Sequence, residues 1–545
     1  MDAVMVEVLR NKIASLVDEM HYHFYRSGYS TIVRESRDFS CVVLDREGRV
    51  IVAPPMLFHA PVYRHLIGRI LELYGGAIKD GDVFVSNHPY EAGLPHVSDM
   101  AFAAPVFADG SLAAFVGSIA HKADVGGAVP GSTSANATEL FQEGLLVPPI
   151  KIWEAGRPLP DIERLILANS RQPALVRGDM DAQVAVTKMG AARIAELCRR
   201  FGVASVTAAF DAILKGAAAA LRAALARLPE GRAAAEGLLD SDGIDVDKPL
   251  KLAVAATIKG GCATFDFSAS DPQARGPVNL RPPMVEACVY YSLIGCLDPG
   301  LPFNDGIRDV VRMIFAPRTI TNAASPAPVS NYQMVNRRLV DVILETLAVF
   351  NPARAIAHSG SSSALGIAWA RGRPGQPAMQ YELIGSGSAY GAGAGHDGTS
   401  ATATHMSNVH ITPIEILESE FPCRIARFDL VPDSGGAGRW RGGLSLRREY
   451  ELLEDATVIC RFEKTRYPPK GMAGGHAGAR SRFVIGLGTD AERELPASAR
   501  LEMKAGTRFL LQSAGGGYGD PHERDPSRLA RDIAEGYVSR ESAAD

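Results

Sequence analysis

The sequence predicts an α+β fold, a mixed α/β chain of several parts in which helical and strand-rich stretches are largely separate. Three observations favour this class: a helical spacing of apolar residues near the start, long helices rich in alanine and leucine over residues 175–228, and strand-like runs from residue 248 onward. A chain of 545 residues is long enough for two to four domains. We expect an N-terminal domain over residues 1–235 that ends in the long helices, and a strand-rich C-terminal domain with glycine-rich loops over residues 236–545.

The first helix is predicted by apolar residues that recur every three or four positions, which is the spacing of one helix face. These residues are Met5, Leu9, Ile13, Leu16, Met20 and Phe24. The helix is expected to end near Gly28, and two strands over 41–44 and 49–52 should follow, joined by a turn. A second helix, which buries Leu66 and Ile70, should stop at the glycine pair after Tyr74. Later in the chain, helices are predicted over residues 285–296 and 338–350.

A longer β-hairpin is predicted in the middle of the N-terminal part. Residues 101–107 and 112–119 are apolar runs typical of buried strands, and Ala108-Asp109-Gly110 between them is a tight-turn signature. A hairpin that turns there places Asp99 almost opposite His121, and paired residues of an antiparallel ladder lie about 4.5–5.5 Å apart. His96 lies on the loop that leads into the first strand.

These three residues form a candidate metal site. Two imidazoles and one carboxylate are a ligand set that leaves open positions on a metal ion, as catalytic sites require. The same residue types also occur as caps and turn residues at strand ends, and their spacing alone leaves both interpretations open. Asp38, which precedes the first short strand, is by composition a turn carboxylate among charged neighbours.

Two loops beside the hairpin are candidate binding segments. Asn87-His88-Pro89-Tyr90 is a polar, stiffened loop, and such loops on a rigid scaffold often carry function. After His121, Gly126 and Gly127 permit positive φ, and with Ser132 they could hold a carboxylate or phosphate on backbone N–H groups. A plain surface loop fits the same composition.

The C-terminal part carries no recognisable nucleotide loop. The glycine-rich stretch 385–408 matches neither GxGxxG nor the Walker pattern. A formal net charge of −4 gives no indication of a nucleic-acid partner or of a membrane surface. We expect no membrane span and no leader, and the seven scattered cysteines favour reduced thiols in a cytoplasmic protein.

Several segments together resemble the hydantoinase B/oxoprolinase family nearly end to end. They include RESRDFSCVVLD, NHPYEAGLPHVSDM, HKADVGG, PGSTSANATELFQEGLLVPPIK, FDFSASDPQARGPVN, TPIEILESEFP, DSGGAGRWRGG and GGGYGDPHERD, in that order. The family includes the B-type subunits of ATP-dependent N-methylhydantoinases and caprolactamases, and metal-bearing subunits of acetone carboxylase-type enzymes.

The resemblance implies roles for particular residues. His96, Asp99 and His121 match the family's metal ligands, for manganese, zinc or iron. Asp38 matches a candidate acid/base or substrate-orienting group. Asp124 is expected to align a ligand histidine or to manage protons. The family commonly has Asn-Asp-Pro-Tyr where this chain has Asn87-His88-Pro89-Tyr90, so His88 could tune the substrate or add a ligand.

The resemblance also implies a partner and an activity. A hydantoinase A-like subunit would bind ATP with magnesium in a hetero-oligomer, and the long alanine-rich helices are the expected contacts to it. This chain would then open a cyclic amide such as a hydantoin, a lactam or 5-oxoproline. The alternatives are a subunit of an ATP-dependent ketone carboxylase and a non-catalytic structural subunit.

Overall fold

A computed structural model describes residues 2–52, 57–361, 364–369, 379–383, 388–407 and 409–543. It confirms the α+β class, with helices and several separate sheets. The first residues of the predicted glycine-rich stretch 385–408 lie outside the described residues, as does residue 408.

A seven-stranded antiparallel sheet forms the N-terminal part, with strand order β2-β1-β5-β4-β3-β6-β7. The strands are β1 (Phe39–Asp45), β2 (Val50–Val52), β3 (Val83–Ser86), β4 (Asp99–Ala108), β5 (Ser111–His121), β6 (Ile150–Glu154) and β7 (Arg157–Pro158). Almost every residue of β4 and β5 is buried, which explains why their sequences are apolar runs rather than alternating ones. β1 pairs antiparallel with β2, and β4 pairs antiparallel with β5, so both predicted hairpins are confirmed.

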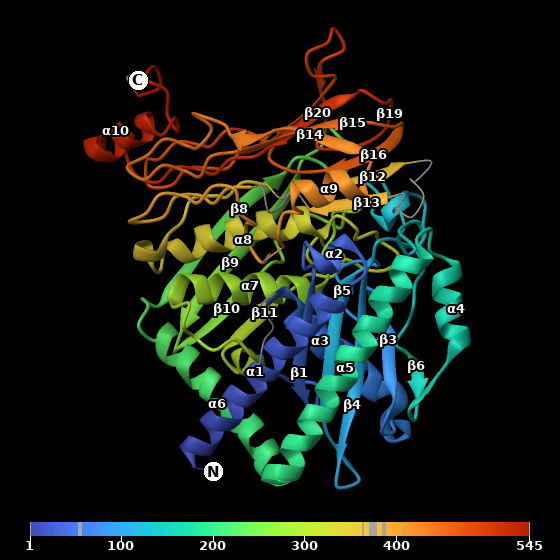
Figure 1. Ribbon diagram of the computed structural model, residues 1–545. Helices are drawn as coiled ribbons and strands as arrows, with labels where there is room; N and C mark the ends of the chain where they lie inside the picture. The colour runs from blue at the N-terminus through green and yellow to red at the C-terminus, as the bar shows by residue number, and fades with distance from the viewer. Residues whose placement is uncertain are drawn as a thin grey trace.

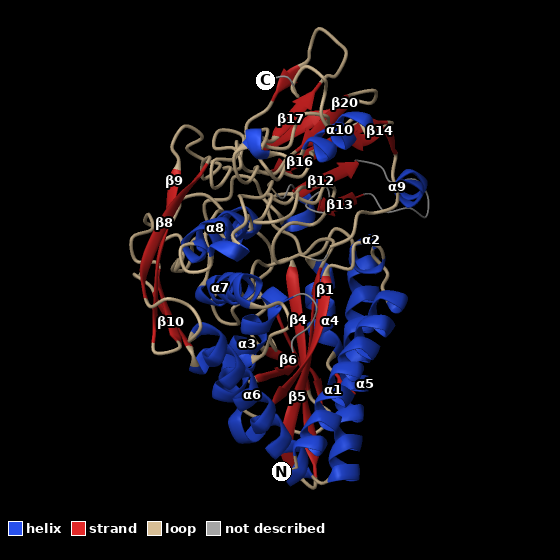
Figure 2. Cartoon of the chain, turned by 90° about the vertical axis from the view of Figure 1, so that its left-hand side faces the viewer, coloured by secondary structure: helices blue, strands red, loops and turns tan. Residues whose placement is uncertain are grey.

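Helices cover both faces of this sheet (Figure 2). On one face lie α1 (Ala3–Ser27) and α5 (Pro173–Phe201), and α6 (Val203–Leu225) continues from α5 after Gly202. The predicted apolar face of the first helix is buried here: Leu9, Ile13, Leu16, Met20 and Phe24 belong to this core. On the other face lies α3 (Ala60–Tyr74), followed outward by α7 (Pro282–Leu297), which packs on α3, and by α8 (Tyr332–Ala348), which packs on α7. Two short helices, α2 (Thr31–Arg34) and α4 (Pro160–Ala168), lie at the edges.

A second sheet packs on the far side of α7 and α8, so that these helices lie between two sheets (Figure 2). Its order is β11-β10-β9-β8, from β8 (Gly231–Leu239), β9 (Leu250–Lys259), β10 (Cys262–Asp266) and β11 (Val311–Ile314). The domain boundary expected at residue 235 falls inside β8. The largest hydrophobic core also joins residues from both sides of that position, from Ile32 to Val409.

The rest of the chain builds two sheets that pack on each other above α8 (Figure 1). One has the order β13-β12-β16-β19, from β12 (Ala364–Trp369), β13 (Met379–Leu383), β16 (Ala456–Arg461) and β19 (Ser498–Met503). The other has the order β14-β15-β20-β17-β18, from β14 (Cys423–Leu430), β15 (Leu446–Leu452), β17 (Arg482–Ile485), β18 (Arg493–Glu494) and β20 (Arg508–Gln512). Two helices flank them, α9 (Ile414–Glu420) and α10 (Pro526–Ala534).

Among the described residues, α6 is the one helix whose length and composition would suit a membrane span. About 33% of its apolar window is buried inside the protein, and core helices of soluble proteins meet the same criteria. The sequence-based expectation of no spanning helix is therefore qualified at α6, which packs against α1, α5 and β10.

Candidate metal centre

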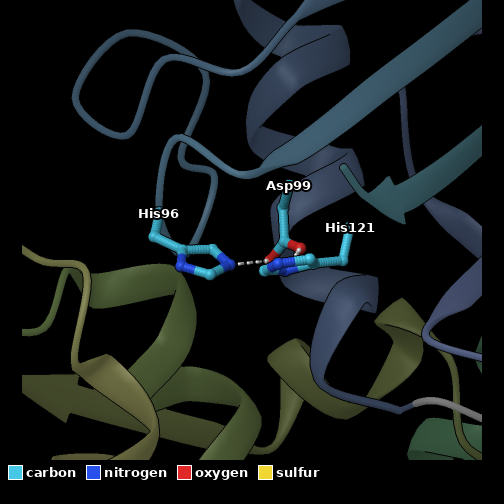
Figure 3. A group of neighbouring side chains, drawn as sticks. All are labelled: His96, Asp99 and His121. Atoms are coloured by element: carbon cyan, nitrogen blue, oxygen red, sulfur yellow. Dashed lines mark ion pairs between the residues drawn. The ribbon is translucent and has the colours of Figure 1, made fainter. Parts of the chain in front are cut away.

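The two-strand hairpin brings two of the three candidate ligands together at its open end. Asp99 is the first residue of β4 and His121 is the last residue of β5, and the two pair directly in the ladder. His96 lies one turn earlier, where its carbonyl accepts the N–H of Asp99 at 3.3 Å. Figure 3 shows the three side chains pointing toward one another.

The ligand atoms of these side chains converge on one point. His96 Nε2 lies 3.3 Å from Asp99 Oδ2, and His121 Nδ1 lies 3.4 Å from Asp99 Oδ1. One donor atom from each residue lies within 4.8 Å of the others, and all three residues are buried. We call these three residues the tripod.

Burial and the neighbouring charges together set the pKa values of His121 and Asp99. Burial lowers the pKa of His121 to about 4, helped by the charge of His96 and opposed by Asp99, so the ring is neutral at pH 7. Burial also opposes ionisation of Asp99, but the neighbouring imidazoles outweigh it and hold the pKa of Asp99 below its usual value. A neutral imidazole and a carboxylate are the forms that bind a metal ion.

The tripod fits a divalent cation by a second criterion. Among the described residues, His96 Nδ1 has no hydrogen-bond partner, and His96 Nε2 and Asp99 Oδ2 have none beyond their mutual contact at 3.3 Å. Buried polar atoms are nearly always satisfied in native proteins, so these atoms call for an ion or water. Within the described ranges, His96, Asp99 and His121 form the group with metal-ligand geometry.

Asp38 lies beside the tripod. Its carbonyl accepts the N–H of His121 at 3.1 Å, so the backbone before β1 is tied to the end of β5. The Asp38 side chain is 5% exposed. Burial raises its pKa well above the usual value and the charge of Asp99 adds to this, while Arg337 opposes it.

Sequence reasoning missed three residues around the tripod. The rings of Tyr332 and His96 pack edge to face, with their centroids 5.0 Å apart. His59 is buried, its Nδ1 lies 2.7 Å from Ser40 Oγ, and burial lowers its pKa to about 4. Arg337 is buried, and among the described residues its Nη1 has no hydrogen-bond partner. No spacing motif marks Tyr332 and Arg337, because α8 comes more than 200 positions after the hairpin.

The structure corrects the role expected of Asp124. Its Oδ1 accepts the N–H groups of Gly126 at 3.0 Å and Arg171 at 2.7 Å, and its Oδ2 accepts from Gly131 and from the Arg171 side chain, both at 3.0 Å. Both oxygens of this buried carboxylate therefore hold residues 126–131, which we call the glycine-rich loop, and Arg171. Asp124 neither aligns a ligand histidine nor has an oxygen left to take a proton.

The same contacts correct the expected anion cradle. Gly126 and Gly127 have positive φ angles of 89° and 83°, as predicted. However, the N–H groups of Gly126 and Gly131 already donate to Asp124. Ser132 Oγ accepts the N–H of Val125 and donates to the carbonyl of Gly126. A Cβ on Gly127 would lie 2.7 Å from the backbone of residues 142 and 143, so this glycine serves close packing.

His88 bonds within its own loop, and Tyr90 joins that loop to residues much later in the chain. His88 Nδ1 accepts the N–H groups of Tyr90 and Glu91 at 3.2 and 3.1 Å. The Tyr90 hydroxyl donates to the carbonyl of Ala327 at 2.6 Å, and its ring lies under the guanidinium of Arg281. His88 is therefore not an added ligand among the described residues.

Replacing Asp124 with asparagine is expected to destabilise the protein by about 2–4 kcal/mol, because a buried network loses its charge and one acceptor oxygen. Denaturant unfolding measures this free energy, with Asp109→Asn at the exposed hairpin turn as the matched control. Metal content should stay unchanged, and a variant that loses bound metal without losing stability would contradict this role.

Glu143 links the glycine-rich loop to the segment that enters α8. Its Oε1 accepts the N–H groups of Val329 and Ser330 at 2.8 and 2.7 Å, and burial raises its pKa to about 8. Between pH 4.5, the ordinary pKa of a glutamate, and about pH 8, Glu143 is ionised in the unfolded state and protonated in the folded state. This group therefore contributes stability that is lost as the pH rises through that window.

The variant Glu143→Gln should remove this loss, because glutamine keeps the acceptor oxygen and cannot ionise. Relative to the parent, we expect the variant to gain about 3–4 kcal/mol of stability between pH 5 and pH 8. Unfolding curves at several pH values check this, with Glu139→Gln on the exposed neighbouring turn as control. A stability difference that does not change with pH would rule out a protonated Glu143.

Comparisons with known proteins agree over the whole chain. A family model described as hydantoinase B/oxoprolinase matches residues 2–521. The B-type subunit of a putative D-/L-hydantoinase from Pseudomonas sp. (strain NS671) is 30% identical, and the match covers 99% of this chain and 94% of that protein.

Solved structures show the same fold. The crystal structure of ATP-dependent caprolactamase from Pseudomonas jessenii superposes with a TM-score of 0.91 at 26% identity, over 100% of this chain and 95% of that one. A nucleotide-free structure of acetone carboxylase superposes with a TM-score of 0.89 over 100% of this chain and 79% of that one. Its identity of 18% limits that likeness to the fold.

Proposed function

Because this chain belongs to the hydantoinase B/oxoprolinase family, we propose that it is the metal-binding catalytic subunit of an ATP-dependent cyclic-amide hydrolase. The observation that carries the proposal is the buried tripod, whose donor atoms lie within 4.8 Å of one another. The substrate class is a cyclic amide such as a hydantoin, a lactam or 5-oxoproline. A hydantoinase A-like partner binds the ATP and its magnesium.

The names of the relatives support the substrate class and the partner. One relative is a subunit of a putative hydantoinase, and a matching structure is an ATP-dependent caprolactamase. Both substrates are rings closed by an amide. The sequence of this chain offers no recognisable nucleotide loop, which is consistent with ATP binding on another subunit.

Ring opening adds water across the amide carbon–nitrogen bond. A manganese, zinc or iron ion held by His96, Asp99 and His121 would supply Lewis-acid chemistry for the amide carbonyl or for water. Asp38, beside the tripod, is the carboxyl that holds or moves the proton between water and the leaving nitrogen. The surrounding buried residues exclude bulk water, which strengthens every charge interaction at the site.

The test is copurification with the hydantoinase A-like partner, followed by ADP release and product analysis over a panel of hydantoins, lactams and ketones. We expect ring-opened product that requires both subunits and ATP. His121→Ala should abolish product formation, whereas His23→Ala on the exposed face of α1 should not. Incorporation of labelled bicarbonate into product would instead identify a ketone carboxylase, and ATP turnover without any product would favour a structural subunit.

A further inference from the structure

A pocket that none of the tripod residues lines lies between α7, the later turns of α8 and the glycine-rich segment 388–407. Its volume is about 280 Å³, which suits a small molecule. The polar residues that line it are Tyr291, Arg354, Tyr390, His396 and His405, and Leu344 and Ile356 form part of an apolar wall. None of the described residues that line it is acidic.

A chain of hydrogen bonds leads from this pocket into the protein. The Tyr390 hydroxyl accepts the backbone N–H of His405 at 3.0 Å and lies 3.2 Å from the Tyr291 hydroxyl. The Tyr291 hydroxyl lies 3.4 Å from His405 Nδ1, and His405 Nε2 lies 3.0 Å from Asp341 Oδ1. His405 and Asp341 are almost fully buried, at 1% and 2% exposure.

The buried end of the chain fixes the direction of these bonds. Asp341 also accepts from Lys464 Nζ, and from the N–H of Ser359 at 3.0 Å. Burial opposes its ionisation, but Lys464 and two histidines hold the pKa of Asp341 well below its usual value, so it is an anion. An anion there places the proton of His405 on Nε2 and leaves Nδ1 as an acceptor for the Tyr291 hydroxyl.

In this arrangement the hydroxyl proton of Tyr390 is available to a ligand. Burial holds the pKa of Tyr291 well above its usual value, so its hydroxyl stays protonated and donates to His405. The Tyr390 oxygen already accepts from the backbone of His405, so its own proton can turn either to Tyr291 or into the pocket. A hydroxyl that can turn into a pocket is a donor for a ligand oxygen.

The backbone around this chain is strained. His405, Met406 and Lys464 have φ angles of 42°, 56° and 70°, although none of them is glycine. Such conformations persist only where the surroundings impose them, and they cluster at functional sites.

The charges around the pocket favour an anion. Arg354 is an exposed cation at its rim. Arg337, buried to 5% exposure, lies within electrostatic range of Tyr291, Tyr390 and His405, and among the described residues its Nη1 has no hydrogen-bond partner. An apolar wall with cations and hydroxyl donors fits a ligand with a small hydrocarbon body and one acidic group.

We propose that this pocket is a second ligand site, independent of the tripod, that binds a small organic anion through the hydroxyls of Tyr390 and Tyr291. His405 and Asp341 are positioning residues, which hold the two hydroxyls so that Tyr390 donates to the ligand. Carboxylates and phosphate monoesters share the required chemistry, and the test separates them.

Isothermal titration of the full-length protein with butyrate, glutarate and phenyl phosphate tests the site, with neutral butyramide as the matched ligand. We expect an anion to bind and the amide not to bind. Tyr390→Phe should weaken binding by about tenfold or more, as loss of one hydrogen bond to a charged group does. Tyr74→Phe removes the hydroxyl of a half-buried tyrosine outside the pocket and should leave binding unchanged.

The positioning role has its own readout. Tyrosine labelled with carbon-13 at the ring carbon that bears the hydroxyl should report ligand binding as a shift of the Tyr390 resonance. His405→Ala should weaken binding and reduce that shift. His405→Asn should restore part of the binding and part of the shift, because the asparagine side chain has an amide oxygen that can accept the Tyr291 hydroxyl in place of Nδ1. A merely structural histidine would give no such recovery.

Three results would overturn the proposal: no anion binds, the amide binds as well as the anions, or Tyr390→Phe binds like the parent. If the tyrosine variant does not fold, Arg354→Gln at the exposed rim provides the same test and should also weaken binding. His121→Ala should keep the anion affinity, and Tyr390→Phe should keep its metal content. This site and the tripod therefore fail independently, and an affinity lost with His121 would place the ligand at the tripod instead.

Discussion

Asp99→Asn is expected to remove bound metal from the purified protein and to reduce ring-opening activity by more than about 100-fold, since losing a group that only supports a metal ligand already costs about 10–100-fold. The substitution preserves the shape of the side chain and removes its charge. An amide oxygen is a weaker ligand than a carboxylate, and only the two imidazoles remain as strong ligands. Elemental analysis and ADP-coupled product assays measure the two effects.

The matched control for this variant is Asp18→Asn, the same chemical change at an exposed position of α1. It should retain both metal and activity. Thermal unfolding of both variants separates ligand loss from loss of the fold. If Asp99→Asn carried as much metal as the parent protein, the tripod would not be the metal site.

Asp38→Asn is expected to have the second large effect, a loss of activity of about 10²–10⁴-fold with metal content unchanged. The reason is its position: the Asp38 backbone is bonded to that of His121, and its buried side chain lies beside Asp99. Asparagine fills the same space but cannot hold or move a proton. Steady-state kinetics at saturating ATP and elemental analysis of the same sample give the comparison.

The two aspartate variants therefore differ in what they retain. Asp99→Asn loses metal and activity together, whereas Asp38→Asn loses activity alone. Asp109→Asn, at the exposed turn of the hairpin, should lose neither. If Asp38→Asn lost its metal, Asp38 would be a ligand, and if it kept full activity, the proton would have to move through another group.

The core of the candidate site could be predicted because it is local. Asp99 and His121 lie on neighbouring strands joined by a tight turn, so the position of the turn fixes their register. The apolar runs on both sides of the turn located the strands, and the structure confirms that the two residues pair. The first helix followed from its spacing for the same reason, since one buried face repeats along a single segment.

The start of α8 shows where local patterns stop being informative. The sequence predicts this helix over residues 338–350, yet it begins at Tyr332. Its first turns bury polar side chains, among them Asn336 and Arg337, as well as the apolar Val335, so the polar and apolar positions do not separate there into an exposed and a buried face. Those unrecognised turns are the ones that approach the tripod.

Asp124 shows the same limit. Its place after His121 suggested a role at the metal site, but both of its oxygens are bonded to the loop that follows and to Arg171, 47 positions later. Spacing along the chain indicates which side chains can be near one another, but not which partner each one takes.

By itself, the sequence determined the α+β class, the hairpin and the meeting of the hairpin's two ends, because these depend on contacts between neighbouring segments. Only the tertiary structure decided which groups surround the tripod, that Asp124 holds a loop, and that Tyr291, Tyr390 and His405 share a pocket. Those residues come from segments about 100 positions apart, and packing of the whole chain brings them together. The free energy that selects such contacts is summed over entire cores, and no short motif records it.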